Sequence, residues 1–154
     1  MIAKFIKSTK YALNGIYIGI KEERNVRIDI VAFIYVHLLS LFYDFTATQR
    51  VILVVICFNI LAFELMNTAV ERAVDKPDDK HYMAAGYAKD TAAGGVLLAA
   101  IGAVIAGIMM FWDVAVFKEI FAFFTQNILY AAALAVSAIA AYLFITYDRF
   151  IKKQ

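Results

Sequence analysis

The amino-acid sequence predicts an all-α integral membrane protein, a helical bundle with an N-terminal amphipathic surface helix, three membrane spans and an additional fourth C-terminal span. Of the 154 residues, 64% are hydrophobic and only 18% are charged, and the mean hydropathy is +0.74. A soluble domain carries roughly 45–50% apolar and about 25% charged residues. Four stretches are also continuously apolar over about 20 residues, the length that an α-helix needs to cross a bilayer. A soluble globular enzyme and a disordered chain are therefore excluded.

Charge, cysteine content and patterning exclude further classes of protein. A net charge of +2 and a pI of 8.6 are too mild for a nucleic-acid-binding protein. The single cysteine, Cys57, rules out a disulfide scaffold and a cysteine-based metal site. The apolar runs are continuous rather than alternating, so the spans are helices and not barrel strands.

The first element is a surface helix over residues 1–20. Lys4, Lys7 and Lys10 recur at a spacing of three, while isoleucine, phenylalanine and leucine side chains fill the other faces. A basic amphipathic helix of this kind lies on a membrane surface rather than across it.

The spans follow in order along the chain. We expect them over residues 27–45, 49–75, 84–112 and 127–147. The segment between the last two, WDVAVFKEIFAFFTQN, is typical of an interfacial stretch with aromatic anchors. The sequence thus divides into residues 1–112, with the surface helix and three spans, and residues 113–154, with an outer interfacial segment, the additional span and a basic tail.

Lysine and arginine set the predicted orientation, because positive charge is retained on the cytoplasmic side. With both termini inside, only Arg50 and Lys118 lie outside. The inner segments then hold 13 of the 15 basic residues: Lys4, Lys7, Lys10, Lys21, Arg24, Arg27, Arg72, Lys76, Lys80, Lys89, Arg149, Lys152 and Lys153. This asymmetry requires an even number of spans and so supports the fourth helix.

Polar side chains inside the second span point to a functional site. At 100° per residue, five of them share one stripe about 100° wide: Glu64, Asn67, Thr68, Glu71 and Asp75. A polar seam that pairs helices is the simpler interpretation for a single Asn or Thr. For this many acids, the cost of burial favours a metal, a basic partner or a proton-transfer role.

Two charged segments border the stripe at the same cytoplasmic level. Lys89 and Asp90 begin the third span and are followed by small residues that let helices approach closely; a simple membrane anchor would explain the lysine alone. The hinge KEERNVRID, residues 21–29, is for the most part interpreted as a solvated turn. One of its acids would complete a site with Glu71, and such hard oxygen ligands suit Mg²⁺.

These residues resemble the prokaryotic diacylglycerol kinase and undecaprenol kinase family. The resemblance rests on ELMNTAVERAVD (residues 64–75) and AKDTAAGGVL (residues 88–97), together with STKYALNGI (residues 8–16) and EERNVRI (residues 22–28) upstream. It covers about residues 4–112. It implies a small bacterial inner-membrane lipid kinase that forms homotrimers, with active sites at subunit interfaces.

The resemblance also implies individual roles. Glu64 matches the catalytic base, Asn67 lies beside it in the catalytic site, and Glu71 and Glu23 match the ligands of Mg²⁺. Asp29 stands where other members carry an acid or a histidine. Contacts to the ATP co-substrate or its metal are implied for Lys4, Tyr11, Glu23, Glu71, Asp75, Gly86, Lys89 and Asp90.

The chain departs from the family in one respect, because members usually end after the third span. The expected function is transfer of the ATP γ-phosphate to a lipid alcohol, either undecaprenol or diacylglycerol, and the EERNVRI and AKDTAAGG segments resemble the undecaprenol branch more. The alternative is a small ion transporter or channel that uses Glu64 and Glu71 as its path. The transporter would explain the buried acids but not the Lys89–Asp90 pair. A structural membrane protein is the third possibility.

Overall fold

In this computed structural model, which describes residues 1–75 and 83–147, six α-helices and one 3₁₀ turn account for nearly all of the described chain, and these ranges contain no strand. The all-α prediction is therefore confirmed. In chain order the elements are α1 (Ile2–Glu22), α2 (Arg24–Leu39), η1 (Ser40–Phe42), α3 (Ala47–Val74), α4 (Met83–Phe111), α5 (Val114–Gln126) and α6 (Ile128–Thr146).

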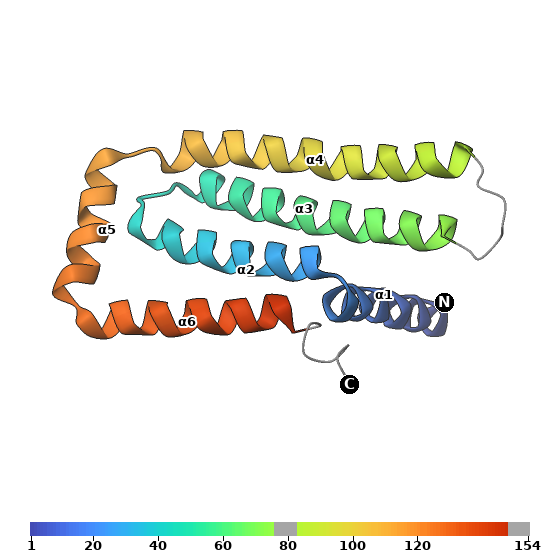
Figure 1. Cartoon of the computed structure of the whole chain (residues 1–154), viewed down its shortest axis with the longest axis horizontal. Coiled ribbons are helices and arrows are strands. Elements are labelled where there is room, and N and C mark those ends of the chain that lie inside the picture. The colour runs from blue at the N-terminus through green and yellow to red at the C-terminus, as the bar shows by residue number, and fades with distance from the viewer. Residues whose placement is uncertain (76–82, 148–154) are drawn as a thin grey trace.

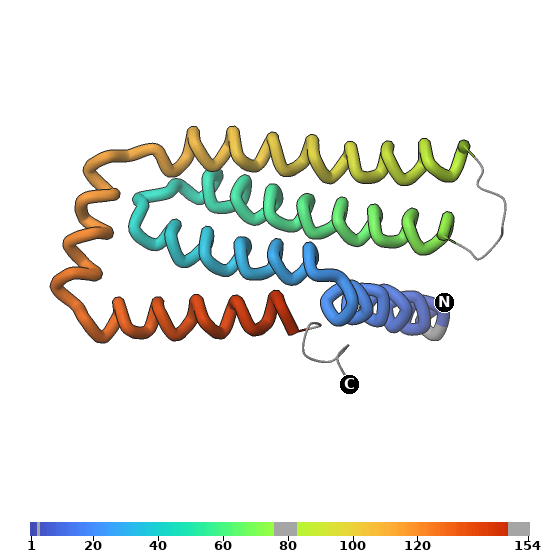
Figure 2. The backbone as a smooth tube through the Cα atoms, in the orientation of Figure 1, coloured from blue at the N-terminus to red at the C-terminus, as the bar shows by residue number. Residues whose placement is uncertain are grey.

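Four long helices run side by side in the order α4, α3, α2, α6 (Figure 1). Residue contacts join α3 to α4, α2 to α3 and α2 to α6. The short helix α5 crosses one end of this row and connects α4 to α6, while α1 extends from the opposite end. We call the end with α5 the outer end and the end with α1 the inner end. The N-terminus and the last turn of α6 both lie at the inner end (Figure 2).

The four long helices are each long and apolar enough to cross a membrane. The first of these spans, Arg24–Phe42, begins and ends three residues before the predicted range of 27–45. It begins early because Glu23 has an extended backbone that separates α1 from α2. Its α-helical part ends at Leu39 because the Ser40 hydroxyl donates to the His37 carbonyl at 2.7 Å and a 3₁₀ turn follows. The other three helices match their predicted ranges to within two residues.

Apolar side chains of the bundle face mostly outward, as they must where lipid replaces water. A compact buried cluster lies at the outer end and consists of Tyr43, Phe45, Leu53 and Phe111. The Tyr43 hydroxyl donates to the Phe111 carbonyl at 2.7 Å, and the two rings meet edge to face at 5.0 Å. This cluster therefore fixes the turn between α2 and α3 against the end of α4.

The surface helix α1 is held to α3 by a close approach at Gly19. A Cβ atom at this position would overlap the Leu65 side chain of α3, whereas a Cβ at Gly15, one turn earlier, would meet nothing within 4 Å. Only glycine therefore lets α1 come this near to α3 without displacing Leu65. The contact keeps the last turn of α1 beside the inner half of α3.

We predict that both termini of the chain are cytoplasmic, since most basic residues of the described chain lie in α1 or in the inner turns of α2, α3 and α4. Green fluorescent protein fused after Gln154 should fluoresce in a bacterial host, because it folds only in the cytoplasm. Alkaline phosphatase fused after Gln126, at the outer end of the bundle, should be active in the periplasm. Fluorescence lost from the C-terminal fusion, with phosphatase active there instead, would contradict the four-span topology.

Candidate functional site

The acidic stripe lies on the inner half of α3. Glu64 is only 4% exposed and Thr68 is also buried, whereas Asn67 and Glu71 are half-buried. The Asn67 amide donates to Glu71 Oε1 at 2.9 Å, which fixes one oxygen of that carboxylate. The other amide atom, Asn67 Oδ1, is buried and has no hydrogen-bond partner among the described residues. It is therefore able to accept a hydrogen bond from a bound hydroxyl.

The inner ends of α3 and α4 are joined by an ion pair. Lys89 Nζ lies 2.9 Å from both carboxylate oxygens of Asp75, and its charge also interacts with those of Glu71 and Asp90. Asp75 is placed by the end of α3, where its N–H donates to the Glu71 carbonyl. The structure thus brings three of the predicted acids, Glu71, Asp75 and Asp90, near the Lys89 ammonium group.

The hinge between α1 and α2 contacts the same region of α3. Arg72 Nη2 lies 2.9 Å from Glu22 Oε2 and 2.8 Å from Glu23 Oε1. Glu23 both ends α1 and precedes α2, so its position depends on the angle between these helices. Arg72 is a site residue that was not predicted from the sequence. A signal was available, since Arg72 is the one basic residue within the acidic segment 64–75 and directly follows Glu71.

A second arginine of the hinge corrects the sequence-based interpretation. That interpretation treated most of the segment as a solvated turn, but within residues 21–29 only Glu23 lies outside a helix. The expected exposure to solvent is right for Arg24 and Asn25, in the first turn of α2. It is wrong for Arg27, which is 1% exposed. Its Nη1 donates to the carbonyls of Ile20 and Lys21, at 2.9 and 3.0 Å, so Arg27 binds the last turn of α1.

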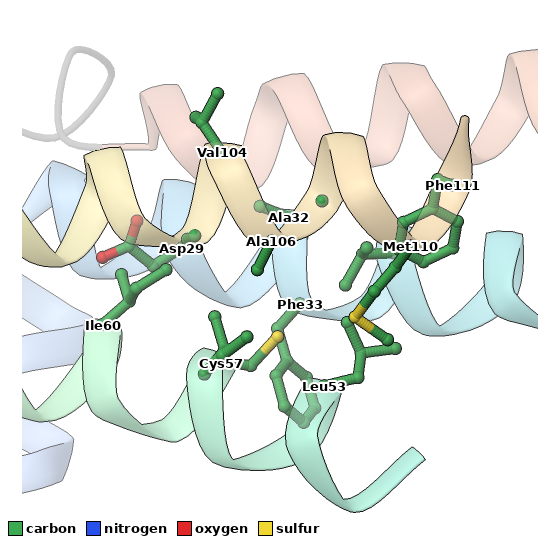
Figure 3. Close-up of a pocket in the computed structure, with 14 residues that line it drawn as sticks. Asp29, Ala32, Phe33, Leu53, Cys57, Ile60, Val104, Ala106, Met110 and Phe111 are labelled. Carbon is green, nitrogen blue, oxygen red and sulfur yellow. The ribbon is translucent and has the colours of Figure 1, made fainter. Parts of the chain in front are cut away.

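An apolar cavity of about 210 Å³ lies between α2, α3 and α4. Asp29 is the only charged residue in its lining and lies toward one end, with Met110 and Phe111 toward the other (Figure 3). The Asp29 carboxylate is near enough to Glu64 for the two charges to interact. The cavity therefore offers space for hydrocarbon next to a pair of acids.

The remaining predicted site residues are more dispersed. Gly86 lies in the first turn of α4, where a Cβ would meet no atom within 4 Å. Lys4 and Tyr11 lie in the exposed first half of α1, and within the described ranges neither forms a hydrogen bond or ion pair with the residues of α3 or α4. The Tyr11 ring is instead covered by Lys7 Nζ at 5.8 Å. Within the described residues of one chain, Lys4 and Tyr11 therefore do not contact the rest of the site.

The donor chemistry at the inner end fits Mg²⁺. Glu71 and Glu23 provide hard carboxylate oxygens, each with one oxygen not used in the hydrogen bonds described above. Within residues 1–75 and 83–147 no group of three or more acids, histidines or cysteines forms a complete cage. Mg²⁺ requires none, because it is commonly held by one or two carboxylates together with substrate phosphates and water.

Comparisons with known proteins find several related chains. A family model described as prokaryotic diacylglycerol kinase matches residues 10–111. An undecaprenol kinase of Bacillus subtilis is 32% identical over 108 residues, which cover 70% of this chain and 88% of that protein. Diacylglycerol kinases of Escherichia coli K12 and Haemophilus influenzae are 28% and 30% identical, over 71% of this chain and 90% and 95% of their own lengths.

Proposed function

Since the chain belongs to the prokaryotic diacylglycerol kinase family, we propose that it transfers the γ-phosphate of ATP to the hydroxyl group of a membrane lipid. One observation carries the proposal: the acids of α3, the α4 lysine and the hinge glutamates all lie at the inner end, where ion pairs join α3 to α4 and to the hinge, and an apolar cavity lies beside Asp29. This is where an aqueous nucleotide and a lipid hydroxyl would meet. Phosphoryl transfer needs mainly positioning and neutralisation of charge, and such a site supplies both.

The nucleotide side of the proposed site consists of Lys89 and its neighbours. Lys89 is bound to Asp75 in an exposed ion pair, and exposed pairs contribute little free energy, so its ammonium group is readily transferred to a phosphate. Asp90 and Gly86 lie on the same turns of α4, where the absence of a side chain at Gly86 leaves open space. The remaining nucleotide contacts proposed from the family are Lys4, Tyr11, Glu23, Glu71 and Asp75.

Glu71 and Glu23 are proposed to hold Mg²⁺. Bound there, the ion would neutralise charge on the phosphate oxygens. Asn67 orients the Glu71 carboxylate through its 2.9 Å hydrogen bond. Glu23 is held by Arg72. If Mg²⁺ displaced the guanidinium of Arg72, the charge of the Glu23 carboxylate would still be compensated. Arg72 thus acts as a positioning residue for the hinge glutamate.

Glu64 is proposed as the general base, with Asn67 beside it. The carboxylate takes the proton of the lipid hydroxyl, the hydroxyl oxygen forms a bond to the γ-phosphorus, and the bond from the γ-phosphorus to the bridging oxygen breaks to release ADP. Its 4% exposure favours this role, because a buried site excludes water that would compete with the lipid hydroxyl for the γ-phosphate. Asn67 Oδ1 is available to accept a hydrogen bond from the acceptor hydroxyl.

The acceptor is proposed to be undecaprenol or diacylglycerol, the lipids in the names of the relatives. The cavity beside Asp29 supports either, since it is lined almost wholly by apolar side chains. We propose the bacterial inner membrane as the location. An ion transporter remains the alternative, but it leaves the Lys89–Asp75 pair and the hinge glutamates without a role.

We also propose that the chain forms a homotrimer. The face of α3 opposite Glu64 supports this, because it repeats exposed residues every three and four positions, as in a helix–helix seam. Asn59 lies at its centre, exposed in the middle of an apolar span. Its amide donates to the Val55 carbonyl of the same helix at 2.9 Å and has further hydrogen-bonding capacity for a neighbouring helix. The face comprises Ile52, Val55, Asn59, Ala62, Met66, Ala69 and Ala73.

The proposed activity predicts incorporation of ³²P from ATP into extracted lipid by the purified protein, tested with undecaprenol and diacylglycerol in parallel. Glu64→Gln should lower kcat by about 10²- to 10⁴-fold, the contribution of a general base. The KM for ATP should change little, because the phosphates lie nearer to Glu71 and Lys89. Unchanged kcat with weakened ATP affinity would assign the base elsewhere, and wild-type protein that labels neither lipid would refute the kinase.

For the metal, we predict that Glu71→Gln removes most activity and raises the Mg²⁺ concentration needed for half-maximal rate. The amide retains the size of the side chain but loses the anionic oxygens that a hard cation prefers. Glu119→Gln on α5, at the outer end of the bundle, is the matched control and should behave as wild type. Near-normal activity of the Glu71 variant at ordinary Mg²⁺ concentrations would contradict the assignment.

For the homotrimer, we predict that Asn59→Leu weakens self-association, because interhelical hydrogen bonds in membranes contribute about 0.6–2 kcal/mol. Fluorescence energy transfer between labelled copies, followed on dilution into lipid, measures the association. Val104→Leu, at an exposed apolar position of α4, is the control and should leave it unchanged. An Asn59 variant that associates as tightly as the wild type would show that the seam lies on another face.

A further inference from the structure

The helices α5 and α6 follow residue 111, where the match to the family ends. They are attached to α2 and to η1, the 3₁₀ turn that follows it, at three places. At the outer end the Phe42 ring packs against Phe123 of α5 at 5.4 Å. In the middle the Tyr35 hydroxyl and Ser137 Oγ of α6 are 2.8 Å apart and hydrogen-bonded. The added hairpin therefore packs along the span Arg24–Phe42, which α2 and η1 form.

The third attachment lies at the inner end and involves the hinge. Arg27, which already binds the carbonyls of Ile20 and Lys21 in α1, also directs Nη2 toward the Ile145 carbonyl of α6 at 3.4 Å. Its guanidinium lies 5.9 Å from the centre of the Tyr147 ring. One buried guanidinium thus joins the last turn of α1, the first turn of α2 and the end of α6.

The position of this junction links α6 to the proposed site. Lys21 immediately precedes Glu22 and Glu23, the two acids that hold Arg72 of α3. The angle between α1 and α2 sets the place of Glu23, and Arg27 stabilises that angle by binding α1 from within α2. A buried arginine requires compensation on all sides, and the end of α6 provides part of it.

We infer that the end of α6, through Tyr147 and the Ile145 carbonyl, positions the α1–α2 hinge by holding Arg27, and so tunes the nucleotide and metal side of the proposed kinase site. Tyr147 is a positioning residue and touches no substrate. The expected effect on catalysis rests on the proposed function. The dependence of the hinge on α6 is a structural claim and does not rest on it.

The test replaces the Tyr147 ring. Tyr147→Leu should raise the KM for MgATP about two- to tenfold with kcat changed less than twofold, the range expected for loss of a cation–π contact. Tyr147→Phe keeps the ring and should behave as wild type. Tyr142→Leu, one turn earlier in α6 at an exposed position, is the matched control and should also leave both constants unchanged.

Amide hydrogen exchange of residues 20–27 provides a readout that does not depend on activity. Exchange should be faster in Tyr147→Leu than in the wild type and unchanged in Tyr147→Phe and Tyr142→Leu. Unchanged exchange and unchanged KM in Tyr147→Leu would overturn the inference; if this variant does not fold, Tyr147→Met is measured in its place. A wild-type protein without kinase activity would refute the proposed function, while the exchange experiment would still decide the role of α6.

Discussion

Charged groups at the edge of a bilayer have to be compensated by other groups of the protein, and the arrangement of the inner end follows from this requirement. Lys89 of α4 compensates Asp75 of α3, and Arg72 of α3 compensates Glu22 and Glu23 of the hinge. Each pair joins two helices, so the interactions that neutralise charge also fix the inner ends of α1, α3 and α4. The same ion pairs that compensate these charges therefore place the residues of the candidate site.

The two ends of the bundle differ in what holds them. At the outer end, aromatic rings pack around Tyr43 and Phe111, and this cluster contains no charged side chain that could bind an ionic ligand. At the inner end, exposed ion pairs such as Lys89–Asp75 contribute little net free energy. A phosphate or a cation can replace one partner at small cost there, while the outer end keeps the helices in register.

Much of this architecture follows from one-dimensional patterns. Hydropathy located the spans because lipid selects continuous apolar runs, and helical periodicity placed Glu64 and Glu71 on one stripe because that relation is local. The pairing of Arg72 with Glu23 could not be predicted, since it joins residues 49 positions apart and depends on how α1 turns at the hinge. The burial of Arg27 was missed for the same reason: its surroundings include α6, which is distant in the sequence.

The contact between Arg27 and Ile145 spans 118 residues of sequence and has a consequence for biogenesis. During synthesis α2 enters the membrane long before α6 leaves the ribosome, so the guanidinium can bind the Ile20 and Lys21 carbonyls of α1, but not the Ile145 carbonyl, while the first three spans assemble. The last helix then completes its surroundings. The order of translation thus makes insertion of α6 the final step in maturation of the hinge.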